Sequence, residues 1–255
     1  MDKVLSTYLS TFAQIFFMGS KFLKRLKYYG IGFGMGIIIV TFLLPNRSCS
    51  WTPANRVKNM VLGRLLTVNE IEWKLMQSKG LTKEDIISVL NDGKVDFKNS
   101  AKDGDSKVYV IDKEFKTKGK YRFYFTLPNE SFISEVKLGE IDSKKVQNTK
   151  EGKGIFLSIP KDEYIVYPDS TSKVTCQMEQ LQIKTVKQLY AALKTSGSID
   201  FEKTNFEAKP KAEHMLNCIV NKDTISFQAV WYKNKIFISN FISEKTKECN
   251  IELLP

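Results

Sequence analysis

This chain of 255 residues has very little histidine and no closely spaced pair of cysteines. It has one histidine, His214, and four cysteines, none of which forms a C-x-x-C pair. Structural zinc sites need four clustered cysteine or histidine ligands, so we expect no metal and no other cofactor. A general base needs a nucleophile or an acid within hydrogen-bond reach, and no sequence pattern around His214 supplies one. We expect a packed or surface histidine rather than a catalytic one.

The sequence also lacks a phosphate-binding loop. The stretch "YYGIGFGMGIIIVTFLL", residues 28–44, has glycines at alternate positions, and this spacing never gives G-x-G-x-x-G. No Gly-Lys-Ser or Gly-Lys-Thr follows it. The stretch carries no charge over 17 residues, close to the roughly 20 apolar residues of a membrane span. We therefore predict a transmembrane helix at residues 28–44.

Basic residues crowd the N-terminal flank of this stretch, at Lys21, Lys24, Arg25 and Lys27. The positive-inside rule places such a flank in the cytoplasm. We expect a single-pass protein of the cell inner membrane, with the bulk of the chain in the periplasm. A cleaved signal peptide is the main alternative, because a basic region followed by an apolar one is also its signature.

The glycines of the predicted span form two small-xxx-small pairs, Gly30/Gly34 and Gly32/Gly36. This spacing lets two helices approach closely, so one face of the span is a candidate for homodimerisation. The alternative is that glycine is simply common in membrane helices. The lipid bilayer is the expected partner in either case.

Two segments of the chain resemble one another. "LTKEDIISVLNDGKVDFKNS" (residues 81–100) matches "KTVKQLYAALKTSGSIDFEKT" (residues 184–204). Each has a capping-box pattern, one apolar helix face and a glycine where helices commonly end in a left-handed residue. Hydrophobic-Asp-Phe and then three strand-like runs follow in both. The sequence predicts an α+β fold with two diverged α-β-β-β units and antiparallel sheets.

The predicted span and the two predicted units divide the chain into six parts. The two units are thin, so each needs the other or neighbouring segments to close a hydrophobic core. The start of the first part is open, because residues 1–20 predict either an amphipathic helix at the membrane surface or a region upstream of a true start at Met18. The expected parts are a cytoplasmic basic and amphipathic N-terminus (1–27), the transmembrane helix (28–44), a juxtamembrane segment (45–68), the first unit (69–140), a connecting hairpin or linker (141–176) and the second unit (177–255).

A family resemblance emerges from these motifs. The basic "KFLKRLKYYG", the glycine-containing span, "CSWTPANRVKN", a helix and "LNDGKVDFKNS" resemble small membrane-anchored bacterial proteins that carry a domain of unknown function. That domain is distantly similar to the fold of RelE- and barnase-like ribonuclease toxins. The resemblance covers most of residues 21–139 and, through the repeat, 184–243. Soluble toxin-like relatives carry His and Arg on the first helix, whereas neither matching helix here has them, so the resemblance implies the fold and not the activity.

The cysteines permit disulfides if the chain lies outside the cytoplasm. They are Cys49, Cys176, Cys218 and Cys249, and the sequence alone leaves every pairing open. We favour Cys218 with Cys249, because both fall in the second unit.

For two groups of residues both a functional and a structural role are conceivable, and we expect the structural role. Asp96 and Asp200 follow the two helix-ending glycines and are either paired carboxylates or turn-forming residues; we expect the second. "KGKYRFYFTL", residues 118–127, combines basic and aromatic residues that could stack single-stranded bases. Its alternation is nevertheless that of an ordinary half-buried strand, so we do not expect nucleic acid as a partner.

The stretch "CSWTPANRVKN" just beyond the span is the best candidate for partner binding, because tryptophan and arginine dominate interface hot spots. Its alternative role is an anchor at the membrane interface. The candidate residues are Cys49, Trp51, Pro53, Asn55, Arg56 and Asn59. The sequence favours a non-catalytic binding or assembly protein of the cell envelope, with an envelope protein as partner. The alternative is a degenerate ribonuclease or RNA-binding domain that faces the cytoplasm.

Overall fold

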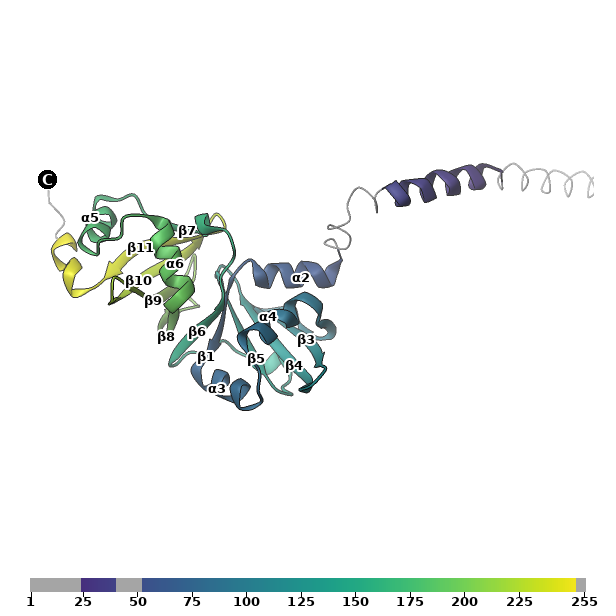
Figure 1. Cartoon of the computed structure of the whole chain (residues 1–255), viewed down its shortest axis with the longest axis horizontal. Coiled ribbons are helices and arrows are strands. Elements are labelled where there is room, and N and C mark those ends of the chain that lie inside the picture. Colours follow the sequence, from purple (N-terminus) through teal and green to yellow (C-terminus); the bar gives the residue numbers. More distant parts are fainter. Residues whose placement is uncertain (1–23, 40–51, 251–255) are drawn as a thin grey trace, which may run out of the picture. The chain divides into compact units, whose positions relative to one another are not determined.

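The computed structural model describes residues 24–39 and 52–250 (Figure 1). The chain divides into two compact units, Met1–Thr52 and Pro53–Pro255. In the first unit, residues 24–39 form a helix that contains all four glycines of the predicted dimerisation pairs. Residues 40–44 of the predicted span lie outside the described residues. Within the described ranges, no helix has both the length and the apolar character of a membrane crossing.

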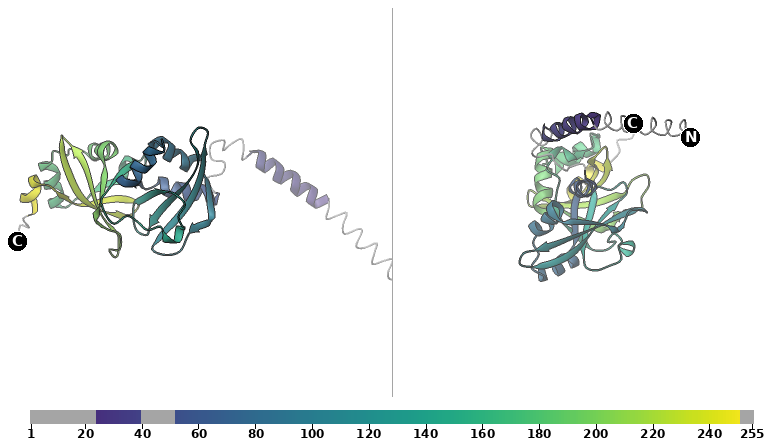
Figure 2. Two further views of the ribbon diagram at one scale, coloured as in Figure 1. Left: turned by 90° about the horizontal axis from the view of Figure 1, so that it is seen from below. Right: turned by 90° about the vertical axis from the view of Figure 1, so that its right-hand side faces the viewer.

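The second unit is an α+β structure built on one mixed sheet of 11 strands (Figures 1 and 2). The strand order is β2-β3-β4-β5-β1-β6-β8-β9-β10-β11-β7. The elements are α2 (Pro53–Leu62), β1 (Leu65–Asn69), α3 (Glu70–Ser78), α4 (Lys83–Asp92), β2 (Lys94–Ala101), β3 (Ser106–Phe115), β4 (Gly119–Pro128), β5 (Ile133–Leu138), η1 (Ser143–Lys145), β6 (Lys153–Ser158), η2 (Glu163–Ile165), β7 (Val166–Pro168), α5 (Ser172–Gln180), α6 (Val186–Ser196), β8 (Ser198–Asn205), β9 (Glu213–Val220), β10 (Asp223–Tyr232), β11 (Lys235–Ile242) and η3 (Glu244–Asn250).

The two halves of this sheet have the same order of elements. Each consists of a strand, two helices and four strands: β1-α3-α4-β2-β3-β4-β5 in the first half and β7-α5-α6-β8-β9-β10-β11 in the second. In each half the first strand pairs in parallel with the last, β1 with β5 and β7 with β11. The strand β6 lies between the halves and pairs antiparallel with β1 and β8.

This topology corrects three expectations. Each helix is followed by four strands instead of three, because the hydrophobic-Asp-Phe segments form strands of their own, β2 and β8. The strands form one continuous mixed sheet instead of separate antiparallel ones. Of the two expected forms of the connecting segment, hairpin or linker, the hairpin is excluded, because β6 pairs with β1 and β8 whereas β7 pairs with β11.

The two matching helices begin as their sequences predict. Thr82 is the N-cap of α4, where its hydroxyl accepts from the Asp85 amide (3.3 Å) and the Asp85 carboxylate accepts from the Thr82 amide (2.8 Å). Thr185 is the N-cap of α6, where its hydroxyl accepts from the Gln188 amide (3.2 Å). The Gln188 side chain accepts from the amide of Lys184, one residue before the N-cap. Each helix start therefore has orphan amides satisfied by side chains.

The glycines that end these helices are required for space and not for a left-handed backbone. Gly93 and Gly197 have φ values of −60° and −66°, so the expected left-handed cap is wrong. A β-carbon on Gly93 would lie 2.4 Å from the Val89 carbonyl oxygen, and one on Gly197 would lie 2.2 Å from that of Leu193. Each glycine therefore lies closer to the last turn of its own helix, and to Ile111 or Phe156, than a residue with a β-carbon could.

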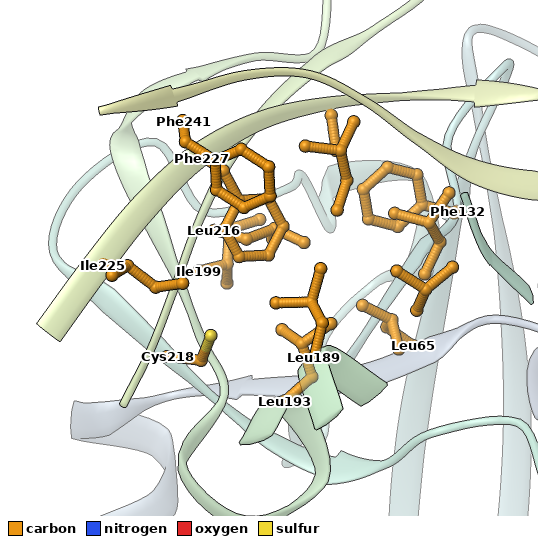
Figure 3. Close-up of a cluster of buried hydrophobic side chains, with 14 of the residues drawn as sticks. Leu65, Phe132, Leu189, Leu193, Ile199, Leu216, Cys218, Ile225, Phe227 and Phe241 are labelled. Carbon is orange, nitrogen blue, oxygen red and sulfur yellow. The ribbon is translucent and has the colours of Figure 1, made fainter. Parts of the chain in front are cut away.

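Two hydrophobic cores lie on opposite faces of the sheet at the junction between the halves. Along β1, Leu66 and Val68 belong to the core of the first half, whereas Leu65 belongs to the core of the second half. Along β6, Leu157 joins the first core and Phe156 the second. Because strand side chains alternate between faces, the helices of the two halves cover opposite sides of one sheet. Figure 3 shows the second core, in which Leu65 packs among residues of α6, β8 and β9.

Candidate functional site

A cavity of about 710 Å³ lies between segments of the two halves. Its wall combines the β4–β5 turn, the residues before β6 and the loop between β8 and β9. The lining residues are Asp105, Ser106, Pro128, Asn129, Glu130, Val146, Gln147, Asn148, Lys150, Phe206, Glu207, Ala208, Lys209, Pro210 and Ala212. Most of these are polar or charged, and the loop between β8 and β9 adds Phe206 and Pro210. The wall therefore offers both hydrogen-bonding groups and apolar contacts to a ligand.

Two polar contacts connect the walls of this cavity. The Lys150 amine lies 3.2 Å from the Glu207 carboxylate, so an ion pair joins the segment before β6 to the loop between β8 and β9. Both side chains are largely exposed, so the pair contributes at most about 1 kcal/mol. The Ser106 hydroxyl donates to the Asn148 side chain at 3.5 Å. Neither contact would strongly oppose displacement by a ligand.

The only histidine of the chain follows this loop and is buried. The His214 Nε2 atom lies 2.8 Å from the Ser131 hydroxyl, which also accepts from the Ile133 amide at 3.0 Å. The His214 Nδ1 atom faces the Ala229 carbonyl oxygen at 3.4 Å. The Phe132 ring packs at 4.3 Å between centroids. A serine beside a histidine is also the arrangement of a nucleophile and its general base. Whether a substrate could reach the pair therefore decides between a catalytic and a structural role.

Burial assigns this pair to the core. His214 is 1% exposed and Ser131 is fully buried, so no substrate reaches them. Burial lowers the pKa of His214 to about 3, and the imidazole is therefore neutral at physiological pH. Of the two expected placements, packed or at the surface, His214 has the packed one. The Ser131–His214 hydrogen bond ties the turn before β5 to β9, and hence the first half to the second.

The pKa of His214 predicts an acid dependence of stability. The imidazole stays neutral in the folded protein down to about pH 3, whereas its unfolded pKa is near 6.5. The unfolded chain therefore binds a proton that the folded one does not, and stability present above pH 6.5 is lost as the pH falls toward 3. The expected loss is about 1.4 kcal/mol per pH unit within this window.

A His214→Gln variant tests this dependence, because glutamine is polar and does not titrate. We expect urea titrations between pH 7 and pH 4 to show a shallower pH slope of the unfolding free energy in the variant than in the parent chain. The carboxylates are common to both proteins, so the difference in slope isolates the histidine. Equal slopes would contradict the burial argument.

Asp96 and Asp200 each serve their own strand. The carboxylate of Asp96 accepts from the Asn99 amide at 3.1 Å, and that of Asp200 accepts from the Lys203 amide at 3.2 Å. The pairing of β2 with β3 and of β8 with β9 shifts register just after these aspartates. Both aspartates thus hold a bulge at the same place in the two halves, which agrees with the structural interpretation.

The same bulge is closed by a second matching pair of bonds. The Ser100 hydroxyl donates to the Asp96 carbonyl oxygen (2.6 Å) and accepts from the Val110 amide (3.0 Å). The Thr204 hydroxyl donates to the Asp200 carbonyl oxygen (2.7 Å) and accepts from the Met215 amide (3.2 Å). A hydroxyl four residues after the aspartate therefore replaces the missing ladder bonds in both halves.

The basic and aromatic strand of residues 118–127 is part of the core. Phe123, Tyr124 and Phe125 are at most 2% exposed, so their rings have no free face for a base. Arg122 is held by Asp112, with bonds of 2.7 and 2.9 Å to the two carboxylate oxygens. That contact raises the pKa of Arg122 further above its usual range. The segment is a strand as expected, but it is buried on both faces from Phe123 onward, so the expected half-buried strand is wrong.

The predicted partner-binding stretch is described only in part. Cys49 and Trp51 lie outside the described residues, whereas Pro53, Asn55, Arg56 and Asn59 belong to α2. That helix buries Val57 and Val61 against the first core. Pro53, Arg56, Asn59 and the neighbouring Met60 are exposed, which leaves them accessible to a partner. Their role in binding stays a prediction.

The disulfide differs from the expected one. Cys249 of η3 is bonded to Cys176 of α5, and Cys218 is a free, buried thiol of the core. Burial raises the pKa of the Cys218 thiol to about 12. The Cys218 side chain points into the sheet core, where Cys249 does not reach, so the sequence preference for Cys218 with Cys249 is wrong.

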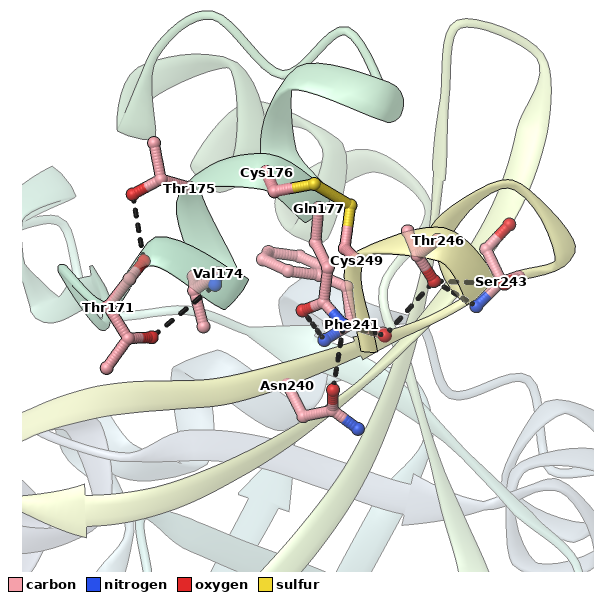
Figure 4. Close-up of a disulfide and its surroundings, with 10 residues drawn as sticks. All are labelled: Thr171, Val174, Thr175, Cys176, Gln177, Asn240, Phe241, Ser243, Thr246 and Cys249. Carbon is pink, nitrogen blue, oxygen red and sulfur yellow. Dashed lines mark hydrogen bonds between the residues drawn. A yellow bond between two sulfur atoms is a disulfide. The ribbon is translucent and has the colours of Figure 1, made fainter. Parts of the chain in front are cut away.

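The disulfide is reinforced by a buried glutamine, as Figure 4 shows. The Gln177 side chain accepts from the Phe241 amide (2.9 Å) and donates to the Phe241 carbonyl oxygen (3.0 Å). It also donates to the Asn240 side chain at 2.9 Å. Gln177 thus continues the hydrogen-bond ladder of β11 and fastens α5 to the sheet beside Cys176.

A buried carboxylate near the cavity escaped the sequence analysis. Glu135 of β5 is 1% exposed and accepts from the amide of Thr149 (2.9 Å) and from its hydroxyl. The Lys137 amine lies 3.7 Å away. Burial raises the pKa of Glu135, and these contacts oppose the rise. Thr149 adjoins Asn148 and Lys150 of the cavity wall, so Glu135 fixes that wall to the sheet.

The fold and these sites define an α+β protein with two halves of like topology and a polar cavity between their loops. Among the described residues, no group of three or more histidine, cysteine or acidic side chains is placed to hold a metal ion. The chain matches no family model, no curated protein and no solved structure.

Proposed function

We propose that this chain is a single-pass membrane protein whose α+β domain lies outside the cytoplasm and serves as a non-catalytic binding or assembly module. The residues from Pro53 onward would form the binding domain, and the uncharged stretch of residues 28–44 would anchor it. Envelope proteins are the proposed partners. A second copy bound through Gly30/Gly34 or Gly32/Gly36 is a further candidate.

The observation that carries the location is the Cys176–Cys249 disulfide. Disulfides persist in oxidising compartments and are rare in the bacterial cytosol. The basic flank before the apolar stretch favours the same orientation. These two features are independent, since one lies in the N-terminal segment and the other in the sheet domain.

The assignment as a binding module is supported by where the reactive groups lie. His214 is buried and Arg122 is paired with Asp112. These are the two side chains that would be the candidate catalytic groups of a degenerate ribonuclease. The accessible features are a polar cavity and the exposed side of α2, and both are suited to binding.

We also propose that the two halves descend from one duplicated unit of the membrane-anchored family that the sequence resembles. Support comes from the matched order of elements, the parallel pairing of first and last strand, and the repeated aspartate bulge. Three matching details of this kind are difficult to explain by chance convergence.

A pair of C-terminal reporters tests the location. We expect a phosphatase fusion, active only outside the cytoplasm, to show activity, and a fluorescent-protein fusion that matures only inside to stay dark. A reporter fused directly after residue 27, and so lacking the apolar stretch and the sheet domain, serves as the matched cytoplasmic control. The reverse pattern would overturn the proposed location and make RNA binding or cleavage by the domain the next measurement.

A further inference from the structure

Residues 141–149 cover the outer sheet face of the first half, which is the face turned away from α4. We call these residues the cover segment. Val146 of this segment packs in a buried cluster with Val108, Val110 and Tyr124. The amide of Ile141 donates to the Tyr124 hydroxyl at 2.9 Å. The fold therefore accommodates a chain segment that includes η1 across this face of β3 and β4.

Further bonds fix the second part of the cover segment. The Lys137 amine donates to the Gln147 carbonyl oxygen at 2.7 Å. The Glu135 carboxylate accepts from the Thr149 amide at 2.9 Å. Both Lys137 and Glu135 belong to β5, the strand that corresponds to β11 in the second half.

The corresponding face of the second half has no such cover among the described residues and carries aromatic side chains. Phe237 of β11 lies between Ile236 and Ile238, which are fully buried in the core, so its ring points to the opposite face. The Phe237 ring is 5.9 Å from that of Tyr167 on β7 and 6.0 Å from that of Tyr232 on β10. Tyr167 and Tyr232 are 44% and 46% exposed.

Three lysines surround these rings. The amine of Lys211 lies 4.4 Å and that of Lys233 lies 5.2 Å from the centre of the Tyr232 ring, and that of Lys235 lies 5.2 Å from the Tyr167 ring. In the part of the chain that the structure describes, none of the three forms an ion pair with a carboxylate. The face thus combines half-exposed aromatic rings with lysines that form no ion pair among the described residues, although the Lys211 amine donates to the Trp231 carbonyl oxygen at 2.7 Å.

We propose that this aromatic–lysine face, formed by Tyr167, Phe237, Tyr232 and the three lysines, binds an extended acidic segment of a partner protein. This inference rests on the proposed binding function and names the surface and the chemistry of the partner. The segment covers the outer face of the second half as the cover segment covers that of the first, although it lies on β7, β11 and the end of β10. Its apolar side chains pack on the rings, and its carboxylates pair with Lys211, Lys233 and Lys235.

A photo-crosslinking amino acid in place of Tyr232 tests this surface in the full chain, in the cells that produce it. We expect a covalent adduct whose linked peptide, identified by mass spectrometry, belongs to another protein and carries net negative charge. The same crosslinker in place of Lys116, an exposed residue of the β3–β4 turn, is the matched control and should not give this adduct.

Charge-reversal variants test the recognition chemistry. Lys233→Glu with Lys235→Glu should lower the yield of the adduct about tenfold, because each acidic contact becomes a repulsion. Lys233→Arg with Lys235→Arg keeps the charge and should keep the adduct. Both positions are exposed, so an unchanged melting temperature will show that the variants are folded.

The other outcomes would overturn the inference. An adduct of lipid mass would assign the face to a membrane surface, and an adduct with this chain would assign it to a homodimer. An adduct unaffected by charge reversal, or none at all, would show that no acidic segment lies there. The reporter fusions are read independently of Tyr232, so a failed crosslink with periplasmic reporter activity would refute the surface and not the proposed location.

Discussion

Replacing Phe132 with alanine is expected to lower the unfolding free energy of the sheet domain by about 3–5 kcal/mol, the cost of removing a fully buried aromatic ring. Phe132 is fully buried at the junction between the halves. Its ring lies 4.3 Å from that of His214 and 6.1 Å from that of Trp231, and its carbonyl oxygen accepts from the Leu65 amide at 2.8 Å. The cavity left by the ring would therefore open the second core beside β1.

The variant also tests whether the halves unfold together. Trp73 of α3 packs on the first core and Trp231 of β10 on the second, so Trp73→Phe and Trp231→Phe proteins that also carry Trp51→Phe each retain one reporter. We expect the urea transitions of both reporters to coincide and to shift by the same amount in the Phe132→Ala background. A first half that unfolds at an unchanged urea concentration would contradict one cooperative sheet. Tyr164→Ala, at an exposed tyrosine, is the control and should leave the midpoint unchanged.

Removing the disulfide should produce an effect of similar size. The bond joins α5 to η3 across a sequence separation of 73 residues. Its loss should cost about 2–4 kcal/mol, mainly because the unfolded chain gains freedom. We expect Cys176→Ser to lower the urea midpoint accordingly.

Chemical reduction supplies the control for that variant. A reducing agent should lower the midpoint of the parent chain to that of Cys176→Ser and leave the variant unaffected. Cys218→Ala provides a matched comparison, because it removes a core thiol but keeps the disulfide, and its response to reduction should equal that of the parent. A parent chain whose midpoint is insensitive to reduction would contradict a stabilising bond.

Local sequence patterns predicted the local parts of this fold. Thr82 and Thr185 mark the helix starts because a cap depends on residues a few positions apart. The alternation in residues 118–127 predicted a strand for the same reason, but not the burial of its outer face, which depends on the distant residue Val146. The glycines were located correctly but explained wrongly, because the clash that a β-carbon at position 93 would make with Ile111 on β3 depends on packing that the helix sequence does not contain.

Local sequence patterns could not predict the contacts that join segments distant in sequence. Ser131 and His214 lie 83 positions apart, and their hydrogen bond forms only because β6 brings the halves together. Cys249 meets Cys176 because η3 returns to α5, whereas Cys218 is turned into the core by the alternation of β9. The aromatic–lysine face combines the β10–β11 hairpin with Tyr167 of β7 and with Lys211, both distant in sequence, so the hairpin sequence alone does not predict it.

The oxidation state of Cys176 and Cys249 in intact cells tests the proposed location most directly. Cells are quenched in acid, and thiols are tagged with a maleimide polymer before and after reduction, with Cys176→Ser/Cys249→Ser as the reference. The account predicts that both cysteines resist the tag until a reductant is added. Tagging of both without reductant would place the domain in a reducing compartment and contradict an extracytoplasmic binding module.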